Sequence, residues 1–235
     1  MLKKRIAMVG LLLFSLPLSS CGNTTKYVTT DDFVFEVRKD GLVLMSYYEE
    51  YPVDVVIPEE VDGKTVIGIT GMLYTSNKLK GVKTLETISI PDTVKSIGSF
   101  CFYDCTNLRS CNIPASLKTI DYSVFKYTGL ENVVIPEGVK KIDRSAFSCC
   151  YSLEYVVLPK SIESIGTDAF LYNNSLENIY YAGTIEDYNK IRFGYKDIDE
   201  KNNITIDDVV SFYSESEPID SGSYWHYVDS KPCKW

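Results

Sequence analysis

An Ile-Pro or Leu-Pro pair recurs five times between residues 57 and 159 of this 235-residue chain and sets the period of a repeat. The last four prolines are separated by 23, 22 and 23 residues; they are Pro91, Pro114, Pro136 and Pro159. In each of these units, aliphatic residues stand three and six positions after the proline and a phenylalanine stands eleven positions after it. The phenylalanines are Phe102, Phe125, Phe147 and Phe170. A fixed period of this length predicts a solenoid, in which each unit forms one coil and buries its apolar face against its neighbours.

The residues around each proline predict which parts of a coil are strands. Apolar residues before the proline alternate with others, as expected for a short strand with one buried face. Proline cannot donate a hydrogen bond to a neighbouring strand, so it ends that strand at the same point of every coil. A second extended piece follows, and we expect a single helical turn to carry each phenylalanine. The predicted fold is a β-dominant α/β repeat solenoid with about 22 to 23 residues per coil.

A solenoid needs a cap at each end, because a terminal coil cannot leave its apolar face bare. Residues 33–47 alternate on either side of a turn at Lys39-Asp40-Gly41, which predicts a β-hairpin as the N-terminal cap. Residues 58–90 form an oversized first coil. Within it we expect a turn at Asp62-Gly63-Lys64 and extra residues that loop out over 74–82.

The C-terminal end predicts a cap of mixed structure. Thr184 and Asp187 have the spacing of a capping box that opens a short helix, and residues 204–213 return to alternation. One domain suffices for a chain of this length. We expect it to span 32–235, with 32–57 as the N-terminal cap, 58–181 as the repeats and 182–235 as the C-terminal cap.

Residues 1–20 have the features of a signal peptide, with three basic residues before a mostly apolar stretch. That stretch is shorter than the roughly 18 to 20 residues that a membrane-spanning helix needs. Leu18-Ser19-Ser20-Cys21 resembles the lipobox of bacterial lipoproteins, in which the cysteine is lipidated and becomes the mature N-terminus. We therefore expect a lipid on Cys21, a polar tether over 21–31, and an extracytoplasmic location at a bacterial membrane or cell surface. The alternative is an ordinary cleavage site with a chance cysteine.

Two complete units, residues 108–125 and 153–170, share the pattern L-x-x-(apolar)-x-(Ile/Leu)-P-x-x-(aliphatic)-x-x-I-x-x-x-x-F. This pattern resembles the BspA-like leucine-rich repeat family of bacterial surface proteins. Residues 179–184, 212–218 and 224–227 resemble the tail that closes many members of that family. The resemblance implies a right-handed leucine-rich solenoid on the cell exterior. It also implies adhesion to host or neighbouring-cell molecules, the role most often proposed for the family.

The charge of the chain argues against some classes of partner. Acidic residues outnumber basic ones by 32 to 24, which gives a formal net charge of −8 at pH 7. Loss of the leader would remove three basic residues and no acid, and would take the net charge to −11. An acidic protein is poorly suited to bind nucleic acid or anionic lipid, so the lipid anchor is the only membrane contact that we expect.

The cysteines after Cys21 do not favour a disulfide framework or a metal site. Cys105 and Cys150 occupy the same slot two coils apart, about 9.6 Å, whereas a disulfide needs Cα atoms within about 7 Å. We interpret the slot as buried; Asn173 fills it in the fourth unit. Paired zinc-ligand spacings are missing, so we expect no metal. One disulfide stays open as an alternative, involving Cys101, Cys111 or Cys233.

No arrangement of residues predicts an enzyme. His226 is the only histidine, and the chain has no Gly-x-Ser-x-Gly motif, so we interpret it as an aromatic-cap residue. Residues 197–203 briefly resemble a calcium loop, but Lys201 and Asn202 replace an oxygen ligand and the turn glycine. No phosphate loop or dinucleotide motif is present. We therefore expect no catalytic residue and no cofactor.

The strands before the prolines predict an exposed surface, because residues between the inward positions point outward. Tyr155, Val157 and Tyr180 should form an exposed aromatic and aliphatic patch, of the kind that marks interaction sites. Asn132 and Asn178 belong to the same outward rows, so the five residues are the candidate ligand-binding site. The alternative is that Tyr and Val stand there only because strands favour them.

A second row of candidates lies four residues after each proline. Lys95, Lys118 and Lys140 form a basic stripe that suits an anionic glycan. The alternative is that solvated lysines protect a strand edge against aggregation.

These observations favour a membrane-anchored, non-enzymatic recognition or adhesion module that binds a protein or glycan through the strand face. Two other classes stay open: a structural envelope lipoprotein without a specific ligand, and an accessory subunit that presents substrate to a partner enzyme.

Overall fold

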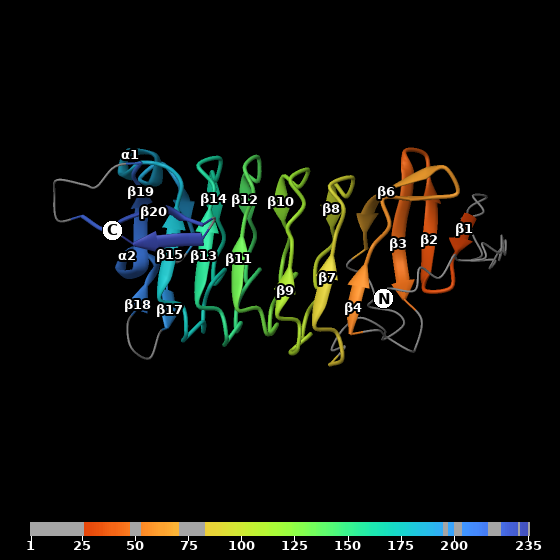
Figure 1. Cartoon of the computed structure of the whole chain (residues 1–235), viewed down its shortest axis with the longest axis horizontal. Helices are drawn as coiled ribbons and strands as arrows, with labels where there is room; N and C mark the ends of the chain where they lie inside the picture. The colour runs from red at the N-terminus through yellow and green to blue at the C-terminus, as the bar shows by residue number, and fades with distance from the viewer. Residues whose placement is uncertain are drawn as a thin grey trace.

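The computed structural model describes residues 26–47, 53–70, 83–194, 197–199, 204–215, 222–229 and 231–234. In Figure 1 the coils stand side by side along the long axis, with β1 at one end and the helices α1 and α2 at the other. A continuous apolar core runs through the coils and contains each repeated phenylalanine. The predicted β-dominant repeat solenoid is confirmed.

The strands before the prolines form the first ladder of the solenoid, in which the first three rungs pair in parallel with one another and so do the last three. A buried residue at the centre of most rungs, such as Val133 or Val156, points into the core. The rungs are β4 (Asp54–Val56), β7 (Thr87–Ser89), β9 (Ser110–Cys111), β11 (Asn132–Val134), β13 (Tyr155–Leu158) and β15 (Asn178–Tyr181). We expected the repeats to start at Pro58. Because β4 pairs with β7, the ladder begins earlier, within the segment 32–57 that was assigned to the N-terminal cap.

The extended pieces after the prolines form a second parallel ladder, also as expected. Its rungs are β10 (Thr119–Ile120), β12 (Lys141–Ile142), β14 (Ser164–Ile165) and β16 (Arg192–Phe193). The first of the extended pieces, β8 (Ser96–Ile97), pairs in parallel with β6 (Lys64–Ile69) instead. The isoleucines of β8, β10, β12 and β14 are buried, and Phe193 at the equivalent position of β16 is half-buried. The two ladders lie on different parts of each coil, so together they position two separate surfaces along the solenoid (Figure 1).

The segment that carries each phenylalanine is not a helical turn, so that prediction was wrong. Every second backbone N–H of this segment donates to a carbonyl oxygen of the next coil. Phe102 N donates to Val124 O, and Phe125 N donates to Ala146 O, each at 2.9 Å. Two residues in each coil therefore adopt the left-handed region, with φ between 52° and 62°. They are Phe100, Asp104, Ser123, Tyr127, Ser145, Cys149, Asp168 and Tyr172. The phenylalanine rings still stack in a column, with centroids 5.2 to 5.6 Å apart.

The N-terminal cap contains the expected hairpin and one further strand. Strands β2 (Phe33–Arg38) and β3 (Gly41–Tyr47) pair antiparallel, and β1 (Lys26–Thr29) adds to β2. The expected tether over 21–31 is therefore a strand in part. Strands β5 (Glu60–Val61) and β6 (Lys64–Ile69) form a second hairpin, whose turn lies where it was predicted. Its residues Asp62 and Gly63 both have positive φ.

The C-terminal cap begins as expected and then differs. Thr184 and Asp187 form the capping box of α1 (Ile185–Tyr188). The predicted alternation over 204–213 is interrupted, because α2 (Ile206–Val209) lies between β18 (Ile204–Thr205) and β19 (Val210–Tyr213). The remaining strands are β17 (Asp197–Asp199), β20 (Tyr224–Val228) and β21 (Lys231–Lys234).

Three expectations fall outside the described residues: the leader over 1–20, the lipidated Cys21, and the loop over 74–82. Among the residues that the structure describes, no helix is both long and apolar enough to cross a membrane.

Candidate functional site

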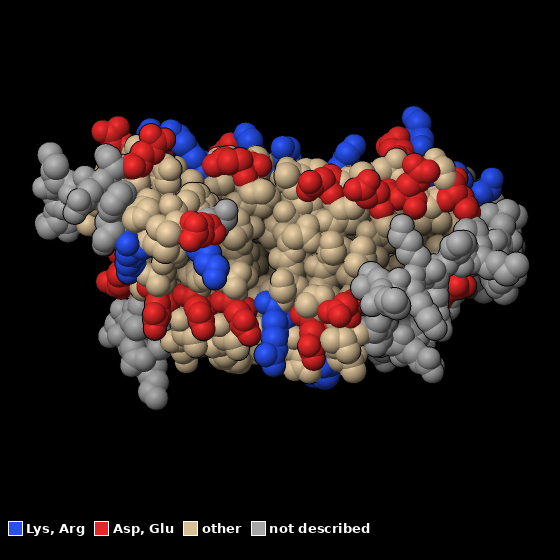
Figure 2. Space-filling view, in the orientation of Figure 1, with Lys and Arg blue, Asp and Glu red and all other residues tan. Residues whose placement is uncertain are grey.

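The outward side of the first ladder is the candidate site, and we refer to it as the strand face. Residues two apart on a strand project the same way, so each rung contributes one residue to each of two rows. The first row is Asp54, Thr87, Ser110, Asn132, Tyr155 and Asn178, and the second is Val56, Ser89, Asn112, Val134, Val157 and Tyr180. Figure 2 shows that this face carries no charged side chain over the central coils, while charged residues gather along its two long borders and at its C-terminal end.

The predicted aromatic patch is wrong in two of its three residues. Val157 and Tyr180 are only 3% and 6% exposed, because Trp225 of β20 packs on them. The Trp225 indole N–H donates to the Tyr181 carbonyl at 3.0 Å, which fixes the ring over the strands. The β20–β21 hairpin therefore covers the strand face at its C-terminal end, where Figure 1 shows the dark blue strands lying across β15.

The other predicted site residues remain accessible to different degrees. Asn132 is exposed, and Tyr155 and Asn178 are half-buried. Tyr155 packs edge-on against Tyr180, with ring centroids 5.9 Å apart, and its burial raises the pKa of its hydroxyl. Tyr155 and Asn178 line a shallow hollow of about 520 Å³ together with two carboxylates and two small polar residues. These further residues are Glu154, Glu177, Asn174 and Ser175.

The face is open from β4 to β11. Val134, 52% exposed, and Val56, 70% exposed, are apolar positions among hydroxyl and amide groups. Asn112 is committed to the fold, because its side chain accepts from Ile90 N at 2.7 Å and donates to Ile90 O at 2.6 Å. These two hydrogen bonds satisfy the Ile90 backbone groups at the point where the pairing of β7 with β9 ends.

Sequence reasoning missed an acidic border that runs along the strand face. The residue five positions before the proline is exposed in each coil and is acidic in most of them. The border comprises Glu86, Arg109, Glu131, Glu154 and Glu177, and Figure 2 shows it as a red row with one blue interruption. Stacked coils place neighbouring carboxylates about 4.8 Å apart at the backbone, and Arg109 relieves this repulsion through an ion pair of 3.8 Å with Glu131. The sequence signal for this border is the recurrence of acidic residues at the position five residues before the proline.

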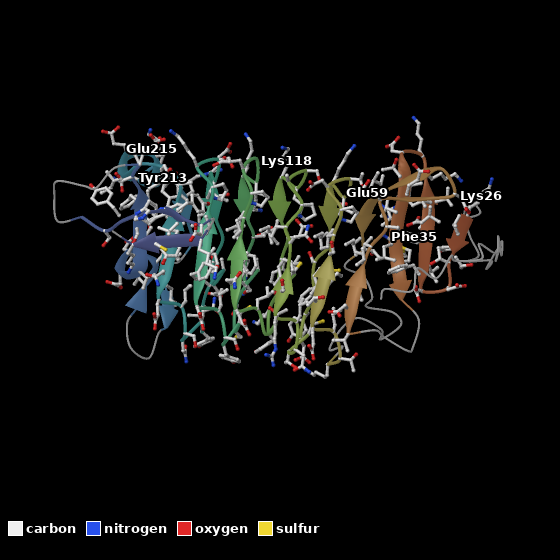
Figure 3. All side chains as sticks on the ribbon, in the orientation of Figure 1. Lys26, Phe35, Glu59, Lys118, Tyr213 and Glu215 are labelled. Atoms are coloured by element: carbon white, nitrogen blue, oxygen red, sulfur yellow. The ribbon has the colours of Figure 1, made fainter. Side chains whose placement is uncertain are left out.

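The basic stripe lies on a different edge of the solenoid. Lys95, Lys118 and Lys140 are all exposed, and Figure 3 shows Lys118 projecting from the edge that carries the second ladder. Lys140 is paired with Glu163 at 2.7 Å, which lowers the pKa of that carboxyl and ends the stripe. The structure therefore does not bring the stripe and the strand-face residues together.

The cysteines and the histidine take the positions of packing residues. All six described cysteines are free, including the three for which a disulfide had stayed open. Burial raises the pKa of the Cys150 thiol to about 12, and Asn173 in the same slot is fully buried, with its Oδ1 accepting from Cys150 N at 2.8 Å. His226 is half-buried on β20. Within the described ranges, no three His, Cys, Asp or Glu side chains are grouped so as to hold a metal ion.

The ladders, the phenylalanine column and the leucine positions define a leucine-rich repeat protein. The family description that matches is the BspA type Leucine rich repeat region, in six copies over residues 75–199. That match covers more than half of the sequence. The chain belongs to the BspA-type leucine-rich repeat family.

Solved structures with the same fold include proteins of the bacterial cell surface. A leucine-rich cell surface protein from Faecalibacterium prausnitzii is 26% identical, with a TM-score of 0.62 over 71% of this chain. The match covers 42% of that protein, so this chain spans less than half of its length. A T. pallidum leucine-rich repeat protein is 25% identical, with a TM-score of 0.58 over 77% of this chain and 83% of its own. Comparison with curated proteins found no match.

Proposed function

We propose that this chain is a non-enzymatic recognition or adhesion module, held outside the cytoplasm by a lipid on Cys21, that binds a protein or glycan through the strand face. The observation that carries the proposal is the open part of that face from β7 to β11, whose outward residues are uncharged (Figure 2). The cell-surface role of the F. prausnitzii relative supports the location.

The chemistry of the face suits a polar, uncharged ligand. Thr87 and Ser110 present hydroxyl groups on paired rungs, where the Thr87 hydroxyl donates to Asp54 Oδ1 at 2.6 Å, and Asn132 presents an amide group on the next rung. Exposed Val56 and Val134 supply apolar contact beside them. Short side chains on a rigid sheet lose little conformational entropy on binding, which favours recognition by a preformed surface.

One observation favours the alternative of a structural envelope lipoprotein. The β20–β21 hairpin covers Val157 and Tyr180, and a covered face needs no ligand. The cover reaches only the C-terminal rungs, because Asn132 and Val134 on β11 stay exposed. The extent of the open part therefore favours recognition over a purely structural role.

A binding screen tests the proposal. The full-length chain is assayed against matrix proteins and glycans, and each hit is retested with Asn132→Ala/Val134→Ser. The matched control is Val228→Ser, which changes a valine of similar exposure on β20. We expect at least one partner whose affinity falls about tenfold or more in the double variant and stays unchanged in the control. If no partner binds, or if the two variants behave alike, the strand face is not a recognition surface.

A further inference from the structure

A shallow hollow of about 550 Å³ lies on the outward side of the second ladder, and we call it the basic hollow. It spans the coils of β12, β14 and β16, and Figure 1 shows β12 and β14 side by side at that edge of the solenoid. These strands pair in register, so Lys141, Ser164 and Arg192 form one outward row. Because Ser164 is short and its two neighbours are long, the middle coil of the three is recessed between them.

Two arginines give the basic hollow its charge. Lys141 and Asp143 both line it and form an ion pair of 2.9 Å. Arg144 and Arg192 also line it, and among the residues that the structure describes neither guanidinium forms an ion pair. Three positive charges and one negative charge leave the lining with a net charge of +2. Arg144 belongs to the coil of β12 and Arg192 to that of β16, so they flank the recessed coil.

The carboxylates in and beside the basic hollow are already engaged. Asp143 Oδ1 accepts from the backbone N–H of the next residue at 2.7 Å, and its Oδ2 accepts from Lys141 Nζ at 2.9 Å. Glu163 is paired with Lys140 at 2.7 Å. Asp121 occupies the slot of Asp143 one coil earlier and does not line the hollow. A group that enters the hollow therefore meets no free carboxylate among the lining residues.

The recessed coil offers a backbone donor that its neighbour has already satisfied. In the coil of β12 the N–H of Arg144 is capped by the Asp143 carboxylate. Gly166 stands in the aspartate slot of the next coil, and the equivalent N–H, that of Thr167, makes no hydrogen bond to any described residue. The place of the missing carboxylate lies within the basic hollow, because Gly166 and Thr167 both line it. An oxygen of a bound anion can take that place.

Hydroxyl groups complete the floor. Neither the Ser164 hydroxyl nor the Thr167 hydroxyl is hydrogen-bonded to another described residue. Gly194 leaves the Thr167 hydroxyl accessible, because a Cβ at that position would stand 2.5 Å from its Oγ1. The floor and the two flanking guanidiniums therefore present hydrogen-bond donors from three adjacent coils.

This lining selects a doubly charged oxyanion. A guanidinium binds carboxylate or phosphate oxygens through two parallel hydrogen bonds. A carboxylate and a sulfate ester each carry one negative charge, whereas a phosphate monoester carries about 1.5 to 2 at pH 7 and has three strong acceptor oxygens. The net charge of +2 and the set of donors without partners match the phosphate monoester best.

We propose that the basic hollow binds a phosphate monoester group. Arg144 and Arg192 bind its oxygens from the two flanking coils, and the Thr167 N–H and hydroxyl donate to an oxygen that stands where the aspartate carboxylate is missing. Free phosphate and a phosphate ester on a larger molecule share this chemistry, and the experiment below separates them. The site is distinct from the strand face, and its function goes beyond the role proposed above.

Isothermal titration calorimetry on the full-length chain, in a phosphate-free buffer of low ionic strength, tests the proposal. The probes are glucose 6-phosphate, inorganic phosphate and glucose 6-sulfate, the last being a matched ester with one charge. The test variants are Arg144→Gln/Arg192→Gln and Thr167→Val, which removes the hydroxyl and keeps the size of the side chain. The control is Arg38→Gln/Arg109→Gln, which removes the same charge from two exposed arginines elsewhere. A thermal melt of each variant confirms that it is folded.

We expect glucose 6-phosphate to bind the wild-type chain at least about fivefold more tightly than glucose 6-sulfate, because it carries the second charge. Its affinity should fall about tenfold or more in the double arginine variant and about threefold in Thr167→Val, since hydrogen bonds to a charged group are strong. The control should change it less than about twofold, because exposed distant charges are screened. Inorganic phosphate that binds as tightly as the ester supports recognition of the phosphate alone, and tighter binding of the ester supports a larger phosphorylated ligand.

Three results would overturn the proposal: equal binding of the sulfate and phosphate esters, normal binding by the double arginine variant, or an equal loss in the control. Unchanged affinity in Thr167→Val would do so as well, since diffuse positive charge does not depend on a hydroxyl. Asn132→Ala/Val134→Ser should bind glucose 6-phosphate normally, so failure of the strand-face proposal and failure of this one give different results.

Discussion

Trp225 packs against Tyr180 with ring centroids 5.4 Å apart, and this contact closes the strand face at its C-terminal end. Trp225 is fully buried, and Tyr213 and Tyr227 pack on it at 5.1 and 5.0 Å. Trp225→Ala should therefore release the hairpin from β13 and β15 and cost about 3 kcal/mol, the lower end of the range for buried Trp. Hydrogen exchange should show faster exchange along β15. Unchanged protection there would contradict the assignment of Trp225 as the residue that holds the cover.

Phe147 lies in the middle of the phenylalanine column, stacked between Phe125 at 5.2 Å and Phe170 at 5.6 Å. Phe147→Ala should lower the free energy of unfolding by about 3 to 5 kcal/mol, because coils on both sides prevent collapse into the cavity. Phe170→Ala should cost no more, since Phe170 is closer to the end of the column. Denaturant titration measures the free energy of unfolding of both variants. A loss below about 1 kcal/mol for Phe147→Ala would contradict the placement of this ring in the core.

Asp187 links α1 to the preceding coil through its carboxylate. Hydrogen bonds from Lys160, Lys190 and Thr184 hold the pKa of this carboxyl well below its ordinary value, with Lys160 the largest cause. A depressed folded-state pKa means that this stabilisation is present above the unfolded pKa, near 4, and is lost as the pH falls toward the folded value. Asp187→Asn should thus reduce the denaturant midpoint more at pH 7 than at pH 2.5. An equal reduction at both values would show that the ion pairs contribute nothing.

The proposed lipid on Cys21 predicts the behaviour of a single variant. Cys21→Ala should leave the solenoid folded and move the protein from the membrane fraction to the soluble fraction, because the lipid is the proposed anchor. Cys233→Ala is the control, since Cys233 lies on β21 at the other end of the chain. Immunoblots of the two fractions measure the distribution. Retention of Cys21→Ala in the membrane fraction would rule out this anchor.

The parts of the fold that were predictable are those in which one residue type recurs at one slot. The prolines located both ladders, and Phe102 to Phe170 located the core, because every coil repeats the same packing problem. The turn at Asp62 and Gly63 was predictable for a local reason, since both residues tolerate positive φ.

The remaining features depend on contacts between distant residues. Trp225 donates to a carbonyl 44 positions earlier, and no periodicity in the sequence links the two. For that reason Val157 and Tyr180 could be placed on the outward row but could not be known to be covered. The left-handed residues were missed because their hydrogen bonds run to the next coil, so propensities along one coil suggested a helical turn.

The two candidate surfaces for the proposed ligand can be compared directly. Once a partner is identified, its affinity is measured at low and physiological salt for Asn132→Ala/Val134→Ser and for a variant with Lys95, Lys118 and Lys140 changed to alanine. The account predicts a loss of about tenfold or more in the strand-face variant at both salt concentrations. In the lysine variant it predicts a change in salt dependence alone, because exposed charges act through screened long-range attraction. Normal binding by the strand-face variant, with loss of binding by the lysine variant at physiological salt, would contradict the account and place recognition on the basic stripe.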